Sequence, residues 1–291
     1  MRRKGWPGLA VLLAALGPTA RGAEPSGPLV AVGVARIDVT PTFPVRLSGY
    51  LGRTSESNRV DQRLWVKALA IGGDDRAAVV LVSVDNLGVG EAVVEEVAGR
   101  LHKAVGLERA RFVVASSHTH SAPCLTGVAP NIFGKRLSES EQAHIDRYTR
   151  ELTDAIERAS LDALKARKPG RLSWAQGSVG FAANRRPQGG PVDHALPVLR
   201  VTDERGAVRA ILVNYACHCT TLKPEDNACS GDWAGHAQEA IEKDHPGAVA
   251  LTVVGCGADA NPTRRLEPGA AADHGQAIAD EIKRLSAGPW T

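Results

Sequence analysis

The sequence is poor in aromatic residues and carries no excess of charge of one sign. Phe, Trp and Tyr make up 4% of the 291 residues, so no aromatic stripe predicts a groove for an acyl chain. The formal charge of +3 includes Arg2, Arg3, Lys4 and Arg21, and it falls to −1 without these four residues. Nucleic-acid binding depends on clustered Lys and Arg side chains that release counterions. We therefore exclude nucleic acid as a partner.

Two common catalytic motifs are also missing. No Gly-x-Ser-x-Gly segment is present, which argues against a serine hydrolase that carries its nucleophile on such a turn. Gly88-Val89-Gly90 precedes a predicted helix, but the third glycine of a dinucleotide-binding motif is absent at the required spacing. Nucleotide-dependent redox chemistry is therefore only weakly indicated.

The first 22 residues have the pattern of a signal peptide. A basic start is followed by an apolar run over 9–16 and by small residues at the exit, Ala20-Arg21-Gly22. The run is too short to span a bilayer, which needs about 20 apolar residues. We expect a secreted or periplasmic protein, with a frayed terminus as the less favoured alternative. Residues 23–291 show no repeat, linker or charge run, and we expect them to form one domain.

Five cysteines follow the predicted signal peptide, and export would place them in an oxidising compartment. The odd number leaves at least one thiol unpaired. Cys229 is close enough in sequence to pair with Cys217 or Cys219, but sequence does not assign the connectivity. We interpret the cysteines as structural.

The pattern of apolar residues predicts an α/β fold, in which mixed sheet layers are covered by helices. Ser138 and Glu141 have the spacing of a capping box, and Asp232 is well placed as a helix cap. The expected strands are 29–39, 63–71, 77–84, 111–115, 171–174, 196–202, 207–215 and 248–254, and the expected helices are 91–105, 138–167, 233–243 and 270–285.

Four of the apolar strands are followed directly by polar residues that are able to do chemistry. In folds of this class the carboxyl ends of strands gather in one crevice, so these residues form a candidate site. They are Asp85 after the third strand, His118 and His120 after the fourth, His218 after the seventh, and Asp259 with Asn261 after the eighth.

The histidines in this set predict a metal site. In extended backbone, residues two apart face the same way, so His118 and His120 can point at one ion, with His218 as the third nitrogen. Imidazole is a preferred zinc ligand, and a catalytic zinc has about three protein ligands and an open position for water. Cys217 and Cys219 flank His218, and the same alternation turns them away from the metal.

Seven segments form an ordered set of motifs along the chain: 33–41, 47–50, 82–85, 117–121 (Ser-His-Thr-His-Ser), 184–185, 214–218 and 257–262 (Gly-Ala-Asp-Ala-Asn-Pro). In this order they resemble the N-terminal catalytic region of the neutral/alkaline non-lysosomal ceramidases. The resemblance implies a neutral-ceramidase-like α/β catalytic domain that is secreted or periplasmic, depends on zinc and hydrolyses the amide of ceramide to sphingosine and a fatty acid.

The resemblance also implies roles for single residues. His118 and His218 would be zinc ligands, His120 would act as an acid/base or orienting residue, and Arg185 would polarise the scissile carbonyl. Asp259 and Asn261, in the Gly-x-Asp-x-Asn-Pro turn, are further candidate catalytic residues. The implied substrate is ceramide or another N-acyl lipid, and peripheral contact with a membrane remains open.

The sequence departs from the family pattern at two points. The family completes its zinc shell with a downstream Glu and Tyr, for which no matching segment precedes Thr291. We expect Asp85 to join the metal ligands instead, with Asp259, or Asp232 together with His236, as alternatives. The second departure is Ala260, which stands where the family carries a serine.

The leading hypothesis from the sequence is a secreted zinc-dependent amide hydrolase of the ceramidase type. One alternative is a non-catalytic exported domain that binds a lipid or a glycan. The other is a zinc hydrolase that acts on a different amide or ester.

Overall fold

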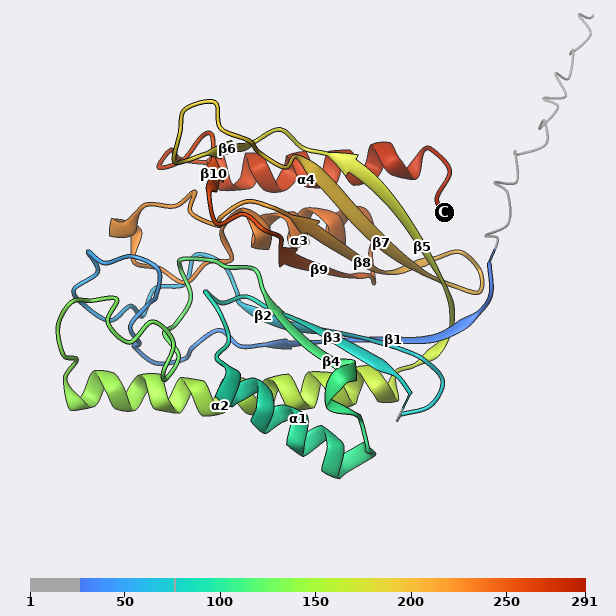
Figure 1. The fold of residues 1–291 in the computed structure, drawn as a ribbon, viewed down its shortest axis with the longest axis horizontal. Coiled ribbons are helices and arrows are strands. Elements are labelled where there is room, and N and C mark those ends of the chain that lie inside the picture. Colours follow the sequence, from blue (N-terminus) through green and yellow to red (C-terminus); the bar gives the residue numbers. More distant parts are fainter. Residues whose placement is uncertain (1–26, 76) are drawn as a thin grey trace, which may run out of the picture.

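The computed structural model describes residues 27–75 and 77–291 (Figure 1). The predicted signal peptide lies outside the described residues. In the part that is described, no helix combines the length and the apolar character needed to cross a membrane.

The described chain forms ten strands, four α-helices and two short 3-10 helices. The strands are β1 Val30–Asp38, β2 Trp65–Ile71, β3 Val79–Val84, β4 Phe112–Ser116, β5 Lys168–Ser178, β6 Ala182–Asn184, β7 Ala195–Asp203, β8 Val208–Tyr215, β9 Val249–Val254 and β10 Ala260–Pro262. The helices are α1 Glu91–Val105, α2 Glu139–Lys165, α3 Asp232–Asp244 and α4 Ala270–Ser286, with 3-10 helices at Arg109–Arg111 and Pro224–Asp226.

Eight strands form one mixed sheet in the order β4-β3-β2-β1-β5-β7-β8-β9. The two outermost pairs, β3 with β4 and β8 with β9, are parallel, and the other neighbours are antiparallel. β1 pairs with β5 over only three residues, and the sheet bends there. The predicted fold class, a mixed sheet covered by helices, is confirmed.

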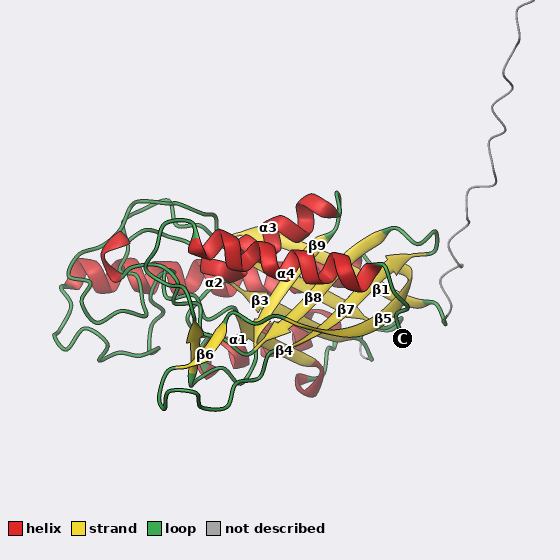
Figure 2. Ribbon diagram, turned by 90° about the horizontal axis from the view of Figure 1, so that it is seen from above, coloured by secondary structure: helices red, strands yellow, loops and turns green. Residues whose placement is uncertain are grey.

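The bend folds the two halves of the sheet onto each other and produces four layers, which Figure 1 shows from the side; Figure 2 looks down on the same stack from above. One core lies between β1–β4 and helices α1 and α2, and a second lies between the β5, β7, β8 and β9 half and helices α3 and α4. A third core fills the space between the two halves, with Val32, Leu69 and Leu251 among its buried members. Burial of apolar surface on both faces of each half explains the near-continuous apolar strands of the sequence.

The predicted helix starts are confirmed at α2 and corrected at α3. Ser138 caps α2: its side chain accepts from the Glu141 N–H, and the Glu141 carboxylate accepts from the Ser138 N–H. In α3 the N-cap is Gly231, and Asp232 is the first helical residue. The Asp232 side chain accepts from the N–H groups of Thr221 and Leu222, in a distant loop, as well as from its neighbour Trp233.

Candidate metal centre

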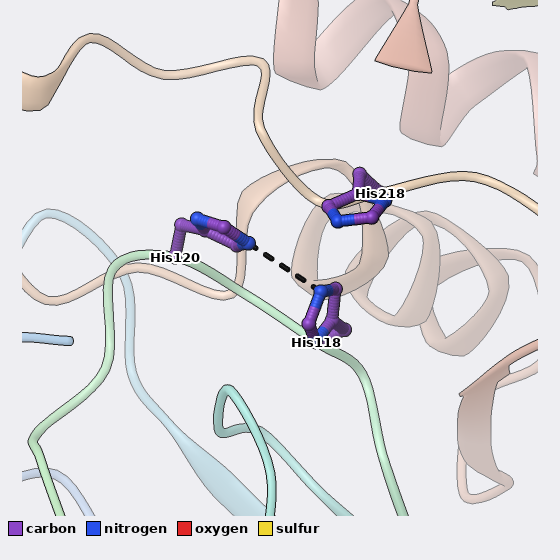
Figure 3. A group of neighbouring side chains, drawn as sticks. All are labelled: His118, His120 and His218. Atoms are coloured by element: carbon purple, nitrogen blue, oxygen red, sulfur yellow. Dashed lines mark hydrogen bonds between the residues drawn. The ribbon is translucent and has the colours of Figure 1, made fainter. Parts of the chain in front are cut away.

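Three histidines from two distant parts of the chain meet at the carboxyl ends of the parallel strand pairs. One ring nitrogen from each of His118, His120 and His218 lies within 4.8 Å of the others (Figure 3). The ring centroids are 4.5 Å apart for His118 and His218, 5.0 Å for His118 and His120, and 5.5 Å for His120 and His218. His218 is buried, and the other two are partly exposed.

The segments that carry the histidines run side by side. Thr119 and Cys219 form a parallel bridge, and the His120 N–H donates to the Cys219 carbonyl at 3.2 Å. The prediction that 118–120 is extended is wrong, because His118 has φ 59°, in the left-handed region. A left-handed residue reverses the chain locally, so the rings of His118 and His120 converge through a turn rather than through strand alternation. Non-glycine residues in this conformation are uncommon, and strained residues cluster at functional sites.

Each imidazole is held by a backbone carbonyl through its Nδ1 atom. The partners are the carbonyl oxygens of Leu87 for His118 (2.7 Å), Gly49 for His120 (2.9 Å) and Gly257 for His218 (2.7 Å). A carbonyl oxygen only accepts, so each Nδ1 must carry the proton. In the neutral rings the Nε2 lone pairs are therefore left free for a cation.

The charge state of the rings fits a metal. Burial, with the neighbouring histidines, lowers the pKa of His120 to about 3, and burial also lowers the pKa of His218. The Nε2 atoms of His118 and His120 are 3.4 Å apart, a distance at which a proton on either atom would form a hydrogen bond between the two rings. The donor set of three neutral imidazoles therefore fits Zn²⁺, which prefers imidazole nitrogen, although it does not identify the metal.

The structure does not bring Asp85 into this group. Its carboxylate is buried and accepts hydrogen bonds from the Trp65 N–H and from Gln238 Nε2, both at 3.0 Å. Burial raises the pKa of Asp85. The alternative pair is also elsewhere: Asp232 binds backbone amides, and His236 lies 3.5 Å from Glu239.

Arg185, Asp259 and Asn261 lie beside His218, because β6 and β10 pair with each other. Arg185 donates from Nε to the Ala258 carbonyl. Burial of His218 is the main cause of its lowered pKa, and the positive charge of Arg185 lowers this pKa further. Asp259 accepts from Asn184 Nδ2 at 3.1 Å, and Asn261 accepts from Thr220 at 3.2 Å. The two side chains thus hold the turn whose carbonyls bind His218. β6 and β10 were not predicted, since each has three residues and depends on the other.

Two side chains next to the histidines were not predicted as site residues. The Tyr50 ring packs on His120 with centroids 5.2 Å apart, and its hydroxyl donates to the Leu222 carbonyl. Burial raises the pKa of Tyr50 to about 12. Arg53 is buried and donates to the carbonyls of Ser48 and His120. The segment 47–50 was a signal for Tyr50, but no local pattern distinguishes Arg53 from a surface arginine.

The cysteines lie outside the histidine group. All five are free thiols, so the suggested pairing of Cys229 with Cys217 or Cys219 is not found. Cys217 and Cys219 are fully buried, as expected for structural residues, and the Cys219 thiol donates to the Ser117 carbonyl at 2.9 Å. Cys256 is exposed.

A cavity of about 600 Å³ begins four residues after His120. It is lined by 124–137 together with Gln142 and Ile145, and by none of the three histidines. The segment that lines it is linked to the site through the 87–90 turn: the Leu87 carbonyl binds His118, and Gly90 lies against Val128.

Comparisons with known proteins identify a matching family and a matching fold. Residues 30–262 match the family described as neutral/alkaline non-lysosomal ceramidase, N-terminal. A crystal structure of neutral ceramidase from Pseudomonas aeruginosa superposes with a TM-score of 0.77 at 20% identity, over 90% of this chain and 45% of that one. A second structure, a ceramidase complexed with C2, gives 0.76 at 20% identity, over 90% of this chain and 44% of that one. The chain therefore spans less than half the length of these proteins. No curated protein matches the sequence.

Proposed function

Because the chain belongs to the neutral/alkaline non-lysosomal ceramidase family, we propose that it is a zinc-dependent hydrolase that cleaves the amide bond of ceramide or a related N-acyl lipid. The observation that carries the proposal is the group of three histidines, each with Nδ1 fixed by a backbone carbonyl and Nε2 left free. The structure complexed with C2 supports a lipid substrate by analogy.

His118 and His218 are the residues that we propose as zinc ligands, since their rings are the closest pair and come from the two segments that the fold brings together. Zinc supplies Lewis acidity and lowers the pKa of a water molecule to about 7. His120 Nε2 would take a proton from the attacking water and pass it to the leaving nitrogen of the amide, while its Nδ1–H stays bonded to the Gly49 carbonyl.

Arg185 is the residue that we propose to stabilise the negative charge that develops on the carbonyl oxygen. Its Nε–H is bound to the Ala258 carbonyl, so the guanidinium is already oriented before substrate arrives. Fixed positive charge at a developing oxyanion is worth about 3–4 kcal/mol in transition-state stabilisation. Asp259 and Asn261 orient the turn and Arg185, whose N–H donates to the Asp259 carbonyl at 2.7 Å.

We also propose that the protein is exported, on the signal-peptide pattern of its first 22 residues. Contact with a membrane surface follows from the proposed substrate, since ceramide resides in lipid layers.

The test is zinc content after purification without chelator, measured in wild type, His118→Ala and His218→Ala. We expect bound zinc in wild type and loss in both variants, with His102→Ala, an exposed histidine on α1, as the matched control. His120→Ala should keep zinc and lose hydrolysis of a fluorescent ceramide. Unchanged zinc content in both ligand variants would refute the proposal.

Substrate class is tested separately on the zinc-loaded protein. Release of fatty acid from ceramide, from an N-acyl amino acid and from an acyl ester is compared under one condition. If only the ester or only the N-acyl amino acid is hydrolysed, that compound class replaces ceramide as the proposed substrate. Zinc binding without turnover of any of the three would favour a lipid-binding domain.

A further inference from the structure

Asp232 is a buried acid to which neither the family resemblance nor the proposed chemistry assigns a role. Only 1% of its surface is exposed, and among the described residues it forms no ion pair with Lys, Arg or His. One carboxylate oxygen accepts from the Thr221 and Leu222 N–H groups, at 2.9 and 3.1 Å, and the other accepts from the Trp233 N–H at 2.6 Å. Burial raises its pKa, but every one of these partners donates, which favours the carboxylate form.

The backbone at Asp232 is strained in a way that serves these contacts. Its φ is 54°, in the left-handed region, at the first residue of α3. An ordinary helix cap is extended and directs its side chain along its own helix. Here the left-handed turn also directs the carboxylate to the 221–222 loop. Strain of this kind persists only when surrounding contacts impose it, and it gathers at functional sites.

Trp233, the next residue, holds the other end of the same segment. Its indole Nε1–H donates to the His218 carbonyl at 2.9 Å, and the side chain is fully buried. Asp232 and Trp233 therefore hold the segment 218–222 at both ends, one through its amides and one through a carbonyl. The same segment offers the Leu222 carbonyl to Tyr50, whose ring packs on His120.

We propose that Asp232, together with Trp233, is a positioning residue that fixes the segment 218–222 and thereby sets the His218 ring in the metal group. It does not touch metal or substrate. The effect on zinc binding rests on the proposed metal-binding function. The clamp, by which we mean the hydrogen bonds from Asp232 and Trp233 to the segment 218–222, is present in the metal-free chain. The two claims are therefore measured separately.

The main variant is Asp232→Asn, which has nearly the same shape and accepts a positive φ readily. It has one acceptor oxygen in place of two, so whichever way the amide turns, its NH₂ group faces at least one N–H donor, either that of Trp233 or those of Thr221 and Leu222. Trp233→Phe keeps most of the ring and removes only the donor to His218. The matched control is Asp203→Asn, because Asp203 accepts from two backbone amides through a single oxygen in a turn remote from the histidines.

The first measurement is amide hydrogen exchange in the metal-free proteins. We expect amide exchange at Trp233, or at Thr221 and Leu222, to be at least about tenfold faster in Asp232→Asn, because one of the two acceptor oxygens is lost, with no change at 118–120. The second is zinc affinity by competition with a chelator. We expect about a tenfold loss in Asp232→Asn and a smaller loss in Trp233→Phe, with wild-type affinity in Asp203→Asn.

Exchange and affinity that match the Asp203→Asn control in both test variants would overturn the proposal. If Asp232→Asn does not fold, the zinc affinity of Trp233→Phe is the test: an affinity below that of Asp203→Asn supports the proposal, and an equal affinity overturns it. If wild type binds no zinc, the proposed function fails, and the exchange data alone establish or refute the clamp.

Discussion

Gly49 should be irreplaceable because its position fixes His120. Its φ is +96°, and a Cβ added there would lie 2.5 Å from both Cβ and Cγ of His120. Its carbonyl also binds the Nδ1–H of the same ring. Gly127 has a comparable φ of +76°, but a Cβ there meets nothing within 4 Å. Alanine at the two positions therefore separates backbone strain from contact with His120.

The magnitudes follow from these contacts. A left-handed alanine costs roughly 1–2 kcal/mol of unfolding free energy at either position. At Gly49 the overlap adds about 1–3 kcal/mol, because carbon atoms normally stay about 3.5–4 Å apart and the ring must move by about 1 Å. A displacement of that size in a catalytic group costs on the order of 100-fold in rate.

Urea unfolding of the metal-free proteins gives the free energies, and turnover of fluorescent ceramide by the zinc-loaded proteins gives the rate. Gly127→Ala should lose about 1–2 kcal/mol and keep its rate. Gly49→Ala should lose more stability and about 100-fold in rate, with zinc still bound, because the ligands that we propose are His118 and His218. The same rate in both variants would refute the reasoning that places His120 in the reaction.

Three further predictions concern a buried cation, a titration and the leader. Arg53→Lys should lower the free energy of unfolding, measured by urea denaturation, by about 2–4 kcal/mol, because the carbonyls of Ser48 and His120 lose buried donors. A loss below about 1 kcal/mol would contradict this. Burial lowers the pKa of His120 from 6.5 to about 3, so between these values the unfolded metal-free chain binds a proton that the folded chain does not. Stability should fall with falling pH in that window, by up to ~1.4 kcal/mol per unit, and the His120→Gln variant should show a shallower slope; equal slopes would count against the assignment. N-terminal sequencing of the exported protein should begin near Ala23, and an intact leader on exported protein would exclude cleavage there.

The regular elements were predictable because their signals are local. The expected helix over 138–167 is α2, Glu139–Lys165, and its start is set by the capping box of Ser138 and Glu141. β6 and β10 carry no such signal: each is three residues long and exists through pairing with a partner about 75 residues away in sequence. Pairing between distant segments cannot be predicted from the spacing of apolar residues within either segment.

The identity of the site residues was more predictable than their geometry. Strand ends correctly indicated that His118, His120 and His218 come together, because parallel strands bring their carboxyl ends together. Alternation could not foresee the left-handed turn at His118, which is held from outside by the Leu87 carbonyl. Asp85 follows a strand just as the histidines do, yet its carboxylate turns to Gln238 on α3, a contact between layers that no local pattern reveals.

The electrostatics of the group bear on which reaction it suits. All three Nδ1–H groups donate to neutral carbonyls, and no carboxylate belongs to the histidine group among the described residues. A divalent ion held by these neutral imidazoles would keep its full charge, and Arg185 would add another positive charge beside it. The ground-state amide is neutral, whereas the transition state of its hydrolysis carries negative charge on oxygen. A positive site therefore binds the transition state more strongly than the substrate, and that difference is what accelerates a reaction.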